Sequence, residues 1–389
     1  MTNVVLIRSN PVSPDPPVEK AANTLISNGY NVTIVGWDRD SSIVEKTEEM
    51  SFENGTARII RFGIPAIFGG GIKKNFAPLV KFQNRLYKWL KKHRDEYDII
   101  HSFDFDTGFV AGKIAKKYNK PLIYHILDFY IDSHNIPGEY LKAKVKNAEI
   151  SVINNADATI ICTDKRREQI AGSSPKRLEI IHNTPKVSGN ISDRFVKTGI
   201  SDRCKIVYVG ILAGSRFLRE IIRFVEHDER FEFHIGGFGV MEDEIADAAN
   251  KCERIFFYGK LPYADTLSLE KSCDVMVAIY DPKVPNHKFS APNKFYESLM
   301  LGKPIVMAKG TGFDEIINDN NIGCLIDFSE DGLSAGLNKL IDQRDKFCSM
   351  AERMKQLYKE NYSWAEMEKR LASLYTGVVL NNEKNTDCK

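Results

Sequence analysis

The sequence predicts an α/β protein with two doubly wound domains, each built on a parallel β-sheet. Short runs rich in β-branched residues alternate with longer amphipathic segments, which is typical of βαβ units. The alternation pauses in the polar stretch 184–202, which contains proline and glycine, and then begins again. The chain of 389 residues also exceeds the roughly 250 to 300 residues at which one hydrophobic core stops growing. Two domains are therefore expected.

The first half of the chain holds six segments with the composition of buried strands. The clearest helix between them runs from Val18 to Asn28 and stops before Gly29, a residue suited to the left-handed conformation that often follows a helix. The first strand is followed by SNPVSPDPPVEK, so the GxGxxG turn of nicotinamide and flavin dehydrogenases is missing from that place. The expected strands are 3–7, 31–37, 57–62, 98–103, 121–126 and 158–163.

The second half repeats the pattern with six further strands. Ligands of open parallel sheets bind beyond the carboxyl ends of the strands, so two such sheets that face each other form a central cleft. We expect a first domain at 1–185, a second at 200–361 and a last helical segment at 362–389 that returns to the first domain. The expected strands are 204–210, 231–237, 254–259, 275–280, 303–308 and 323–328.

Composition and charge exclude several classes of protein. Hydrophobic residues make up 43% of the chain and charged residues 27%, so a disordered or fibrous chain is excluded. The formal net charge of +2 is too small for nucleic acid to be the main partner. The seven scattered cysteines lack CxxC pairs and zinc-ligand spacing, and neither a secretory signal nor about 18 consecutive apolar residues occur. We expect a protein of the reducing cytoplasm.

The segment SAPNKFYESLMLGKPIVMA (290–308) is the most informative part of the sequence, because a polar turn enters a helix there. A helix N-terminus presents unpaired N–H groups and a partial positive charge, which suit an anionic diphosphate. Lys294 would add a full charge, and Glu297, one turn later, can accept hydrogen bonds from ribose hydroxyls. On spacing alone, an amphipathic core helix with solvated polar residues is an equally good interpretation.

Arg216 follows the expected strand that ends at Gly210, in the segment GILAGSRFLREII. Glycines at this place let the backbone and a ligand approach closely, and a guanidinium can bind a phosphate group through two hydrogen bonds. The alternative is a surface arginine that opens a helix. A second glycine turn, IGGFG (235–239), also follows a strand, and a nucleotide can lie against it at Gly237.

These segments together resemble the family-4 glycosyltransferases of the GT-B fold. The resemblance rests on YVGILAGSRFL, FHIGGFG, FYGKLPYADTLSLEKSCDVMVAIYDP, SAPNKFYESLMLGKPIV and YSWAEME, which occur in the same order as in that family. In the first half, DPPVEKAANTLISNGYNVTIVGWDRD, DIIHSFDFDTGFVAGKIAKKYNKPLIYHI and ADATIICTDKRREQI are similar to the family's opening, central and closing parts. The resemblance covers nearly the whole chain.

The resemblance implies a retaining glycosyltransferase that moves a sugar from a UDP- or GDP-linked donor to a glycan or lipid-linked acceptor in cell-surface polysaccharide biosynthesis, without a metal ion or other cofactor. The acceptor would bind in the first domain and the donor in the second. By position, Arg216 and Lys294 would hold the diphosphate and stabilise the charge that grows on it as the glycosidic bond breaks, and Glu297 would hold the ribose. The other donor-site residues that it implies are Gly210, Gly237, Asn293 and, through the backbone near the base, Lys260 and Leu261.

Two positions depart from the family pattern. The first of the two glutamates that the family often shows would fall at Phe289. The histidine that often lies near the reacting sugar would fall at Leu127, in YHILDFY (124–130). His125 lies on the same strand face and is the candidate to replace it. Asp128 is the candidate to contact the acceptor or to orient a proton transfer.

Two further features leave alternatives open. Asp104-Phe105-Asp106 is similar to a metal-binding Asp-x-Asp motif, but its place after a first-domain strand favours a structural or acceptor-binding role over magnesium. The segment 72–94 has many lysines and arginines, no acidic residue and apolar residues at helical spacing. It fits either an anionic surface on the inner face of the cell membrane or a helix that packs its apolar stripe on the first sheet.

Two other functions that use the same fold stay open. A sugar-nucleotide 2-epimerase would need carboxylates clustered beside the sugar, and Phe289 argues against this. A catalytically idle, sugar-nucleotide-binding partner of another transferase would keep the donor site without transfer. Product analysis distinguishes the three functions, because they give a transferred sugar, an epimerised nucleotide or neither.

Overall fold

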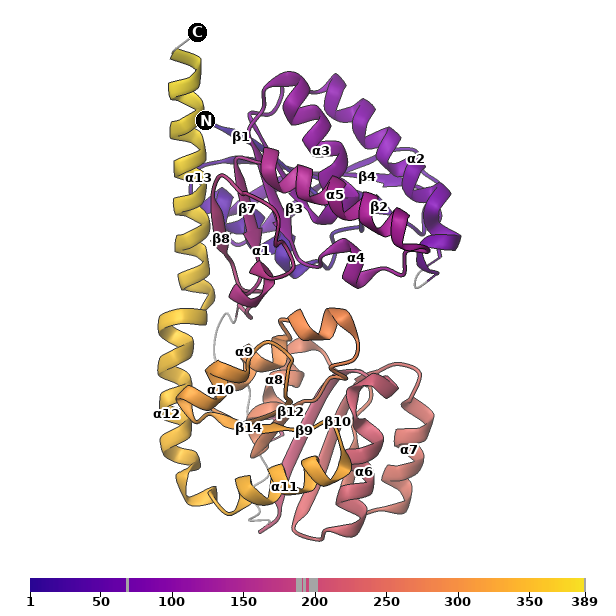
Figure 1. The fold of residues 1–389 in the computed structure, drawn as a ribbon, viewed down its shortest axis with the longest axis vertical. Coiled ribbons are helices and arrows are strands. Elements are labelled where there is room, and N and C mark those ends of the chain that lie inside the picture. The colour runs from indigo at the N-terminus through magenta and orange to yellow at the C-terminus, as the bar shows by residue number, and fades with distance from the viewer. Residues whose placement is uncertain (68–69, 187–190, 192–193, 196–201, 388–389) are drawn as a thin grey trace. The chain divides into compact units, whose positions relative to one another are not determined.

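The chain forms two compact units, each with its own β-sheet covered by helices (Figure 1). Unit 1 comprises Met1–His182 and Met367–Lys389, and unit 2 comprises Asn183–Glu366. The expected linker at 184–202 falls largely on residues outside the described part of the chain. The computed structural model describes residues 1–67, 70–186, 191, 194–195 and 202–387.

Unit 1 is built on an eight-stranded sheet in the order β3-β4-β2-β1-β5-β6-β7-β8. All neighbouring strands are parallel except β3, which pairs antiparallel with β4. The six strands expected here are confirmed, with small shifts at their ends. The strands are β1 (Asn3–Ile7), β2 (Asn31–Asp38), β3 (Lys46–Phe52), β4 (Gly55–Gly63), β5 (Ile99–Phe103), β6 (Leu122–Ile126), β7 (Ala158–Ile161) and β8 (Leu178–Ile180).

Strands β3 and β8 were not expected, and both lie at the edges of the sheet. β3 alternates exposed and half-buried side chains and carries several charges, so it lacks the apolar run of a central strand. It joins β4 through the two-residue turn Glu53-Asn54. β8 has only three residues, all half-buried. The first sheet is therefore parallel, as expected, except at its β3 edge.

Helices cover the faces of the first sheet (Figure 1). The first of them begins after Asp15, whose side chain accepts a hydrogen bond from Val18 N at 3.3 Å, and prolines occupy its first positions. It ends just before Gly29, so the expected helix at 18–28 is confirmed with an earlier start. The helices are α1 (Pro16–Ser27), α2 (Gly71–Lys92), α3 (Asp104–Tyr118), α4 (Tyr130–Ser133), α5 (Glu139–Asn155), the 3-10 helix η1 (Asp164–Arg167) and α13 (Trp364–Asp387).

Helix α2 is the basic segment expected at 72–94, and its apolar stripe packs into the core of unit 1. Phe82 and Leu86 are fully buried, and Phe82 stacks on Trp37 with ring centroids 5.0 Å apart. The packing interpretation of this stripe is therefore confirmed. Among its basic residues, Lys73 has a side chain outside the described part. No helix in the described residues is long and apolar enough to cross a membrane.

The end of the chain belongs to unit 1. From Met367 onward, α13 buries an apolar face that includes Leu371 and Tyr375. The hydroxyl of Tyr375 shares a hydrogen bond of 2.7 Å with Nδ1 of His101, which lies in the buried strand β5. The ring of Tyr30 packs edge-on against Tyr375, with centroids 5.5 Å apart. These contacts attach the last helix to the centre of the first sheet.

Unit 2 holds a six-stranded sheet in the order β11-β10-β9-β12-β13-β14, and all neighbouring strands are parallel. All six strands expected here are confirmed. β12 and β13 are buried along their whole length, as parallel strands covered on both faces should be. The strands are β9 (Cys204–Ile211), β10 (Phe231–Phe238), β11 (Ile255–Phe257), β12 (Val275–Ala278), β13 (Ile305–Ala308) and β14 (Gly323–Ile326).

Two apolar cores lie on the two faces of the second sheet. One packs α6, α7 and α11 against the sheet, and the other packs α8, α9 and α12. The helices are η2 (Gly214–Arg216), α6 (Leu218–His227), α7 (Glu242–Lys251), α8 (Tyr263–Ser272), η3 (Pro285–Phe289), α9 (Asn293–Leu301), α10 (Asp314–Asn320), α11 (Glu330–Ile341), η4 (Arg344–Lys346), α12 (Phe347–Leu357) and the π-helical η5 (Tyr358–Tyr362).

In both sheets the strand order reverses at the centre. In unit 1 the strands run outward from β1 to β2 and β4, and β5 then begins on the other side of β1. In unit 2 they run from β9 to β10 and β11, and β12 begins on the other side of β9. Open α/β sheets bind ligands in the crevice that such a reversal leaves at the carboxyl ends of the strands. The expected places are therefore the ends of β1 and β5, and the ends of β9 and β12.

Candidate functional site

The predicted donor-site residues of unit 2 lie beside the reversal point between β9 and β12. Arg216 is the last residue of η2, shortly after β9, and Lys294 lies in the first turn of α9. Tyr280 follows β12 and is 7% exposed. The backbone N–H of Asp281 donates a hydrogen bond of 3.4 Å to the carbonyl of Ser215. The loops after β9 and β12 are thus joined at the edge where a ligand is expected.

Lys294 places its ammonium group close to the backbone of Gly210 and the ring of Tyr208. A Cβ atom on Gly210 would lie 2.7 Å from Lys294 Nζ, and Nζ is 4.7 Å from the centroid of the Tyr208 ring. Burial disfavours the charged ammonium, but the tyrosines and glutamates around it outweigh burial and raise the pKa of Lys294. Lys294 therefore stays protonated and offers a full positive charge at the strand edge.

Arg216 stacks on Tyr280, with its guanidinium carbon 4.0 Å from the ring centroid. Such stacking holds the planar group and leaves its N–H edges for a ligand. Tyr208 lies under Lys294, and because Arg216 is also near, both cations oppose the rise that burial causes in the pKa of the Tyr208 hydroxyl. The two tyrosines thus join the predicted diphosphate-binding cations into one cluster.

Glu297 follows Lys294 by one helical turn, as predicted, and is 4% exposed. Its Oε1 accepts a hydrogen bond of 3.0 Å from the hydroxyl of Tyr263, the first residue of α8. Burial raises the pKa of Glu297, and Lys294 and the Tyr263 hydrogen bond oppose that rise. Glu297 has the acceptor atoms that ribose hydroxyls require.

Three glycines bring the backbones of neighbouring strand ends together. The N–H of Gly237 donates a hydrogen bond of 2.7 Å to the carbonyl of Gly259. A Cβ atom on Gly237 would lie only 1.8 Å from the carbonyl oxygen of Gly210, and the φ of Gly237 is +133°, which other residues avoid. The surface beside Lys294 therefore consists of bare backbone.

The residues predicted to lie near the base follow β11. Leu261 packs against Gly236 in β10, since a Cβ atom on Gly236 would lie 3.1 Å from Leu261 Cδ1. Lys260 is exposed, and its Nζ lies 5.1 Å from the ring centroid of Phe238. Phe238 is half exposed at the end of β10. An apolar side chain and an open aromatic ring thus flank the predicted base site.

The N-terminus of α9 begins with the exposed residue Asn293. Among the described residues, no side chain caps this N-terminus. An uncapped helix start keeps N–H groups for an anionic ligand. Phe289, where the family's first glutamate was expected, lies at the end of η3, in the turn before α9.

At the reversal point of unit 1, Arg8 follows β1 and forms ion pairs with Asp15, at 2.9 Å, and with Asp104. The Oδ1 of Asp104 also accepts hydrogen bonds from the backbone N–H groups of Leu127, at 2.8 Å, and Asp128, at 3.0 Å. Asp104 therefore ties the ends of β1, β5 and β6 together. This arrangement favours the structural role for Asp104 over a metal ligand.

The second carboxylate of the Asp-x-Asp segment, Asp106, accepts a hydrogen bond of 3.1 Å from Ser9 Oγ. Burial raises the pKa of Asp106. Within the part of the chain that the structure describes, no group of three or more His, Cys, Asp or Glu residues is arranged to hold a metal ion.

His125 lies in β6 and is 5% exposed. Its Nδ1 is 3.4 Å from Nε2 of His101. Burial, with three nearby cations, lowers the pKa of His125 to about 3, so the imidazole is neutral at neutral pH and a weak base. Asp128 is exposed, and its carboxylate pairs with Arg166 at 3.3 Å. Both lie at the carboxyl edge of unit 1, and their catalytic roles stay predictions.

Sequence reasoning missed four residues of the unit 2 cluster: Tyr208, Tyr263, Glu270 and Tyr280. Tyr280 closes the expected strand 275–280, and its place at a carboxyl end was an available signal. Tyr263 and Glu270 had no such signal, because they meet α9 through the packing of one helix on another.

Two family models match most of the chain. The model described as Glycosyltransferase Family 4 matches residues 18–184, almost all of them in unit 1. The model described as Glycosyl transferases group 1 matches residues 203–343, all within unit 2. The two matches follow each other without overlap.

Individual proteins are also similar to this chain over most of its length. D-inositol 3-phosphate glycosyltransferase from Corynebacterium diphtheriae is 22% identical over 340 residues, which span 80% of this chain and 78% of that protein. Sucrose-phosphate synthase from Thermosynechococcus elongatus aligns with a TM-score of 0.77 and 14% identity over 98% of this chain and 100% of that one. HepE from Anabaena, solved with UDP-glucose, aligns with a TM-score of 0.65 and 16% identity over 97% of this chain and 100% of that one. These likenesses show the GT-B fold.

Proposed function

Because this chain belongs to the family-4 glycosyltransferases of the GT-B fold, we propose that it transfers a sugar from a nucleoside-diphosphate sugar, UDP- or GDP-linked, to a glycan or lipid-linked acceptor. The transfer retains the anomeric configuration and serves cell-surface polysaccharide biosynthesis. The donor binds at the carboxyl edge of β9 and β12 in unit 2. The acceptor binds in unit 1, where His125 and Asp128 are the candidates to contact it.

One observation carries the donor assignment. The guanidinium of Arg216 and the ammonium of Lys294 rest on two neighbouring tyrosines, beside a glycine surface and an uncapped helix start. Two cations at the carboxyl edge of one sheet match the two phosphate groups of a nucleoside diphosphate. HepE, which shares the fold, was solved with UDP-glucose, and this supports a donor of the same class.

The cluster also accounts for the chemistry. As the bond between the sugar and the diphosphate breaks, negative charge grows on the departing phosphate oxygens. Cations that are already held in place stabilise this charge without reorganising. Arg216 and Lys294 supply that stabilisation from the protein itself, so we propose that transfer needs no metal ion. UDP or GDP leaves as the product.

A thermal-shift screen tests the donor assignment directly. A ligand that binds only the native state raises the melting temperature, and at one hundred times its dissociation constant it contributes about 2.7 kcal/mol. We expect UDP or GDP, and their sugar conjugates, to raise the melting temperature of the chain equally with magnesium and with a chelator. No shift with UDP, GDP, ADP or TDP would contradict the donor assignment. A shift that requires magnesium would contradict metal independence.

Product analysis with the selected donor then distinguishes the reaction classes. Transfer to an acceptor supports the proposal, whereas an epimerised nucleotide sugar or an unchanged one supports the 2-epimerase or the catalytically idle partner. Because the curated relative acts on D-inositol 3-phosphate according to its name, this compound belongs in the acceptor set beside lipid-linked glycans. The anomeric configuration of the product, read by NMR, tests retention.

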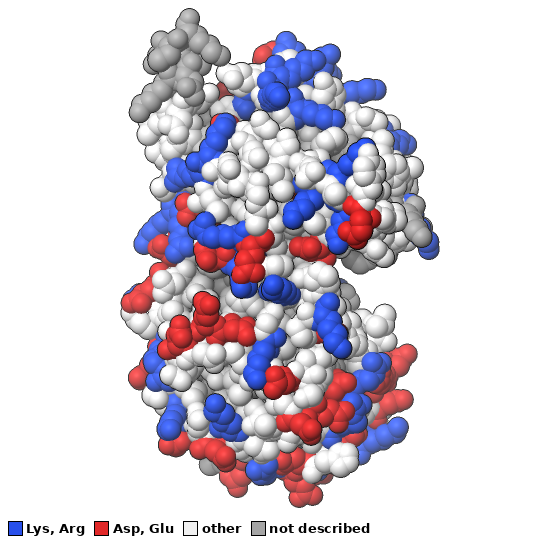
Figure 2. Space-filling view, viewed as in Figure 1, with Lys and Arg blue, Asp and Glu red and all other residues white. Residues whose placement is uncertain are grey.

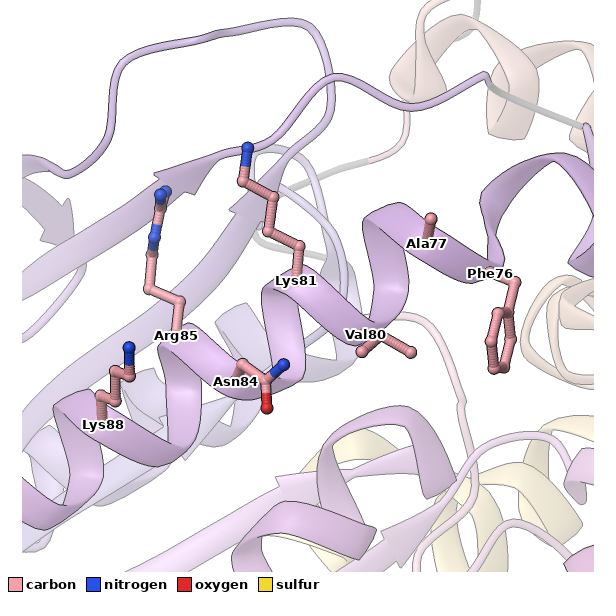
Figure 3. Close-up of a pocket in the computed structure, with 7 residues that line it drawn as sticks. All are labelled: Phe76, Ala77, Val80, Lys81, Asn84, Arg85 and Lys88. Atoms are coloured by element: carbon pink, nitrogen blue, oxygen red, sulfur yellow. The ribbon is translucent and has the colours of Figure 1, made fainter.

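We also propose that the outer side of α2 binds an anionic membrane surface. Phe76 is 61% and Val80 37% exposed, and they line a hollow of about 510 Å³ that also includes Lys81 and Lys88 (Figure 3). Figure 2 shows further lysine and arginine side chains gathered over the end of unit 1 that α2 and α3 form. Each basic residue near such a surface contributes on the order of 1 kcal/mol. The apolar stripe itself is buried, so the contact is peripheral.

Reversing two of these charges tests the membrane contact. We expect the double variant Lys81→Glu with Lys88→Glu to lower the affinity for phosphatidylglycerol vesicles at least about tenfold, since two attractive charges become repulsive. Co-sedimentation measures this. The control pair Lys251→Glu with Lys346→Glu, both exposed in unit 2, makes the same change in net charge elsewhere. Equal losses in the two double variants would contradict a site on α2.

A further inference from the structure

Glu270 is a buried carboxyl group with no assigned role. It lies in α8 and is 0% exposed. Within the described residues, neither of its carboxyl oxygens has a hydrogen-bond partner. Buried polar groups are almost always hydrogen-bonded, and an ionised carboxylate without a partner is costly, so this side chain requires an explanation.

The surroundings of Glu270 belong to the donor site. Tyr263 lies seven residues earlier on α8, on the same helix face, and its hydroxyl donates to Glu297 on α9. This contact establishes that the α8 face with Glu270 packs against the α9 face with Lys294 and Glu297. Two buried carboxyl groups therefore lie within the electrostatic influence of one half-buried lysine, Lys294.

Lys294 is the cation that acts on both Glu270 and Glu297, and the charges of these three groups balance only if one carboxyl holds a proton. Two carboxylates with one ammonium would leave a net negative charge inside the protein, next to the place where a diphosphate binds. Burial, and then the charge of Glu297, raise the pKa of Glu270 well above its usual value, while Lys294 opposes the rise. The pKa of Glu297 is raised too, but Lys294 and the hydrogen bond from Tyr263 oppose this. Glu297 already accepts a hydrogen bond from Tyr263 and neither oxygen of Glu270 has a partner among the described residues, so the geometry also favours Glu270 as the carboxyl that keeps the proton.

We propose that Glu270 is a positioning residue of the donor site: it remains a neutral acid and shares its proton with Glu297, which stays the ionised acceptor for the ribose. No covalent step is involved. The shared proton gives Glu270 the hydrogen bond that it lacks, and it orients the Glu297 carboxylate. It also keeps a second negative charge away from the diphosphate. This inference rests on the proposed donor site.

Among the described residues, the other titratable groups that interact with the pair or with Lys294 are tyrosines. Tyr263 comes from α8, Tyr358 from η5, and Tyr208 and Tyr280 from the ends of β9 and β12 around Lys294. Burial raises the pKa of Tyr208 and of Tyr358. The pKa of Lys294 is raised as well. As pH rises from neutrality, Glu270 is thus the acidic group of this cluster that loses a proton, so its neutral form is lost on the alkaline side.

The protonation state can be measured without any ligand. Infrared spectroscopy of the whole protein at neutral pH resolves the carbonyl stretch of a buried carboxylic acid from that of carboxylates. Glu149 in unit 1 is a second buried glutamate, and burial raises its pKa to about 8, so the measurement uses a Glu149→Gln background. In this background we expect such a band, shifted by ¹³C-glutamate and lost when Glu270→Gln is added. The control Glu226→Gln, at an exposed position of α6, should leave it unchanged. If the band survives the addition of Glu270→Gln or is missing from the Glu149→Gln background, Glu270 is ionised and the proposal is overturned.

Nucleotide affinity tests the positioning role. We expect Glu270→Gln, whose amide can still donate, to bind UDP at neutral pH within about twofold of the wild type. Glu270→Leu lacks a donor and should bind UDP roughly tenfold more weakly, as the loss of a hydrogen bond to a charged group predicts. Above neutral pH, the affinity of the wild type should fall about tenfold more than that of Glu270→Gln, because one like charge appears near the diphosphate.

The outcomes separate this inference from the donor assignment. The same alkaline loss in the wild type and Glu270→Gln, or equal affinity in Glu270→Leu and Glu270→Gln at neutral pH, would assign Glu270 a purely structural role. If the wild type binds none of UDP, GDP, ADP and TDP, the donor assignment fails, and the infrared band alone decides whether Glu270 holds the proton. If GDP binds better than UDP, GDP replaces it as the probe.

Discussion

Replacing Lys294 by alanine is expected to weaken the binding of UDP or GDP by roughly 10- to 100-fold, the effect of losing a charge-assisted hydrogen bond to a phosphate group. Lys294 Nζ lies against the backbone of Gly210, at the place where the diphosphate is proposed to bind. Without this charge, the Glu297 carboxylate would also face the ligand uncompensated. Isothermal titration calorimetry at neutral pH and low salt measures the change.

Two companion variants show whether charge is the cause. Lys294→Met keeps most of the apolar stem and removes only the ammonium, so it should lose as much affinity as Lys294→Ala. Lys303→Ala removes a half-buried lysine just beyond the other end of α9 and should leave nucleotide affinity within about twofold. The melting temperature of each free variant reports whether unit 2 still folds. Wild-type affinity in a folded Lys294→Met would refute the assignment of the donor site.

Asp104→Ala is expected to lower the free energy of unfolding of unit 1 by about 3 kcal/mol, at the lower end of the range found when one partner of a buried ion pair is removed, because this pair is only partly buried. The substitution leaves Arg8 with Asp15 as its ion-pair partner and deprives the N–H groups of Leu127 and Asp128 of their acceptor. Urea unfolding, followed by tryptophan fluorescence in a Trp364→Phe background, measures unit 1 through its buried Trp37 and Trp89.

The matched control at this position is Asp104→Asn. Asparagine tolerates the left-handed backbone of Asp104, whose φ is +59°, and its side-chain oxygen can still accept from the two N–H groups. It should therefore be less destabilising than alanine by at least about 1 kcal/mol. Equal destabilisation by alanine and asparagine would mean that the ion pair with Arg8 alone accounts for the effect.

The sequence was sufficient to predict the central strands of both sheets, and the reason is physical. Parallel strands covered on both faces read as continuous apolar runs, and those that form β5 and β13 are buried along their length. The edge strand β3 has no such run, because its side chains are largely exposed and charged. An Asn-Gly pair, Asn54-Gly55, was the one signal that could have indicated its hairpin.

The candidate site was predicted only in part. Arg216, Lys294 and Glu297 follow strands or begin a helix, and these are places that sequence patterns identify. Their aromatic and acidic neighbours come from other elements, so no local spacing indicates them. Helix α2 shows another limit of sequence analysis. Its apolar stripe fits a membrane surface and a protein core equally well, and the packing of Phe82 on Trp37 in the structure shows that it belongs to the core.

The return of α13 to unit 1 makes that unit discontinuous along the chain, with all of unit 2 inserted before Met367. During synthesis, domains generally fold as units in the order in which they leave the ribosome. Unit 2 is continuous and can fold as soon as it emerges. Unit 1 begins to emerge first, but Tyr375, near the end of the chain, arrives last. Its hydroxyl hydrogen-bonds His101, and its ring packs edge-on against Tyr30. A nascent chain that ends before Met367 therefore carries all of unit 2 but an incomplete unit 1. In that incomplete unit, His101 still lacks its hydrogen bond to Tyr375. Such a state is one for chaperones to protect.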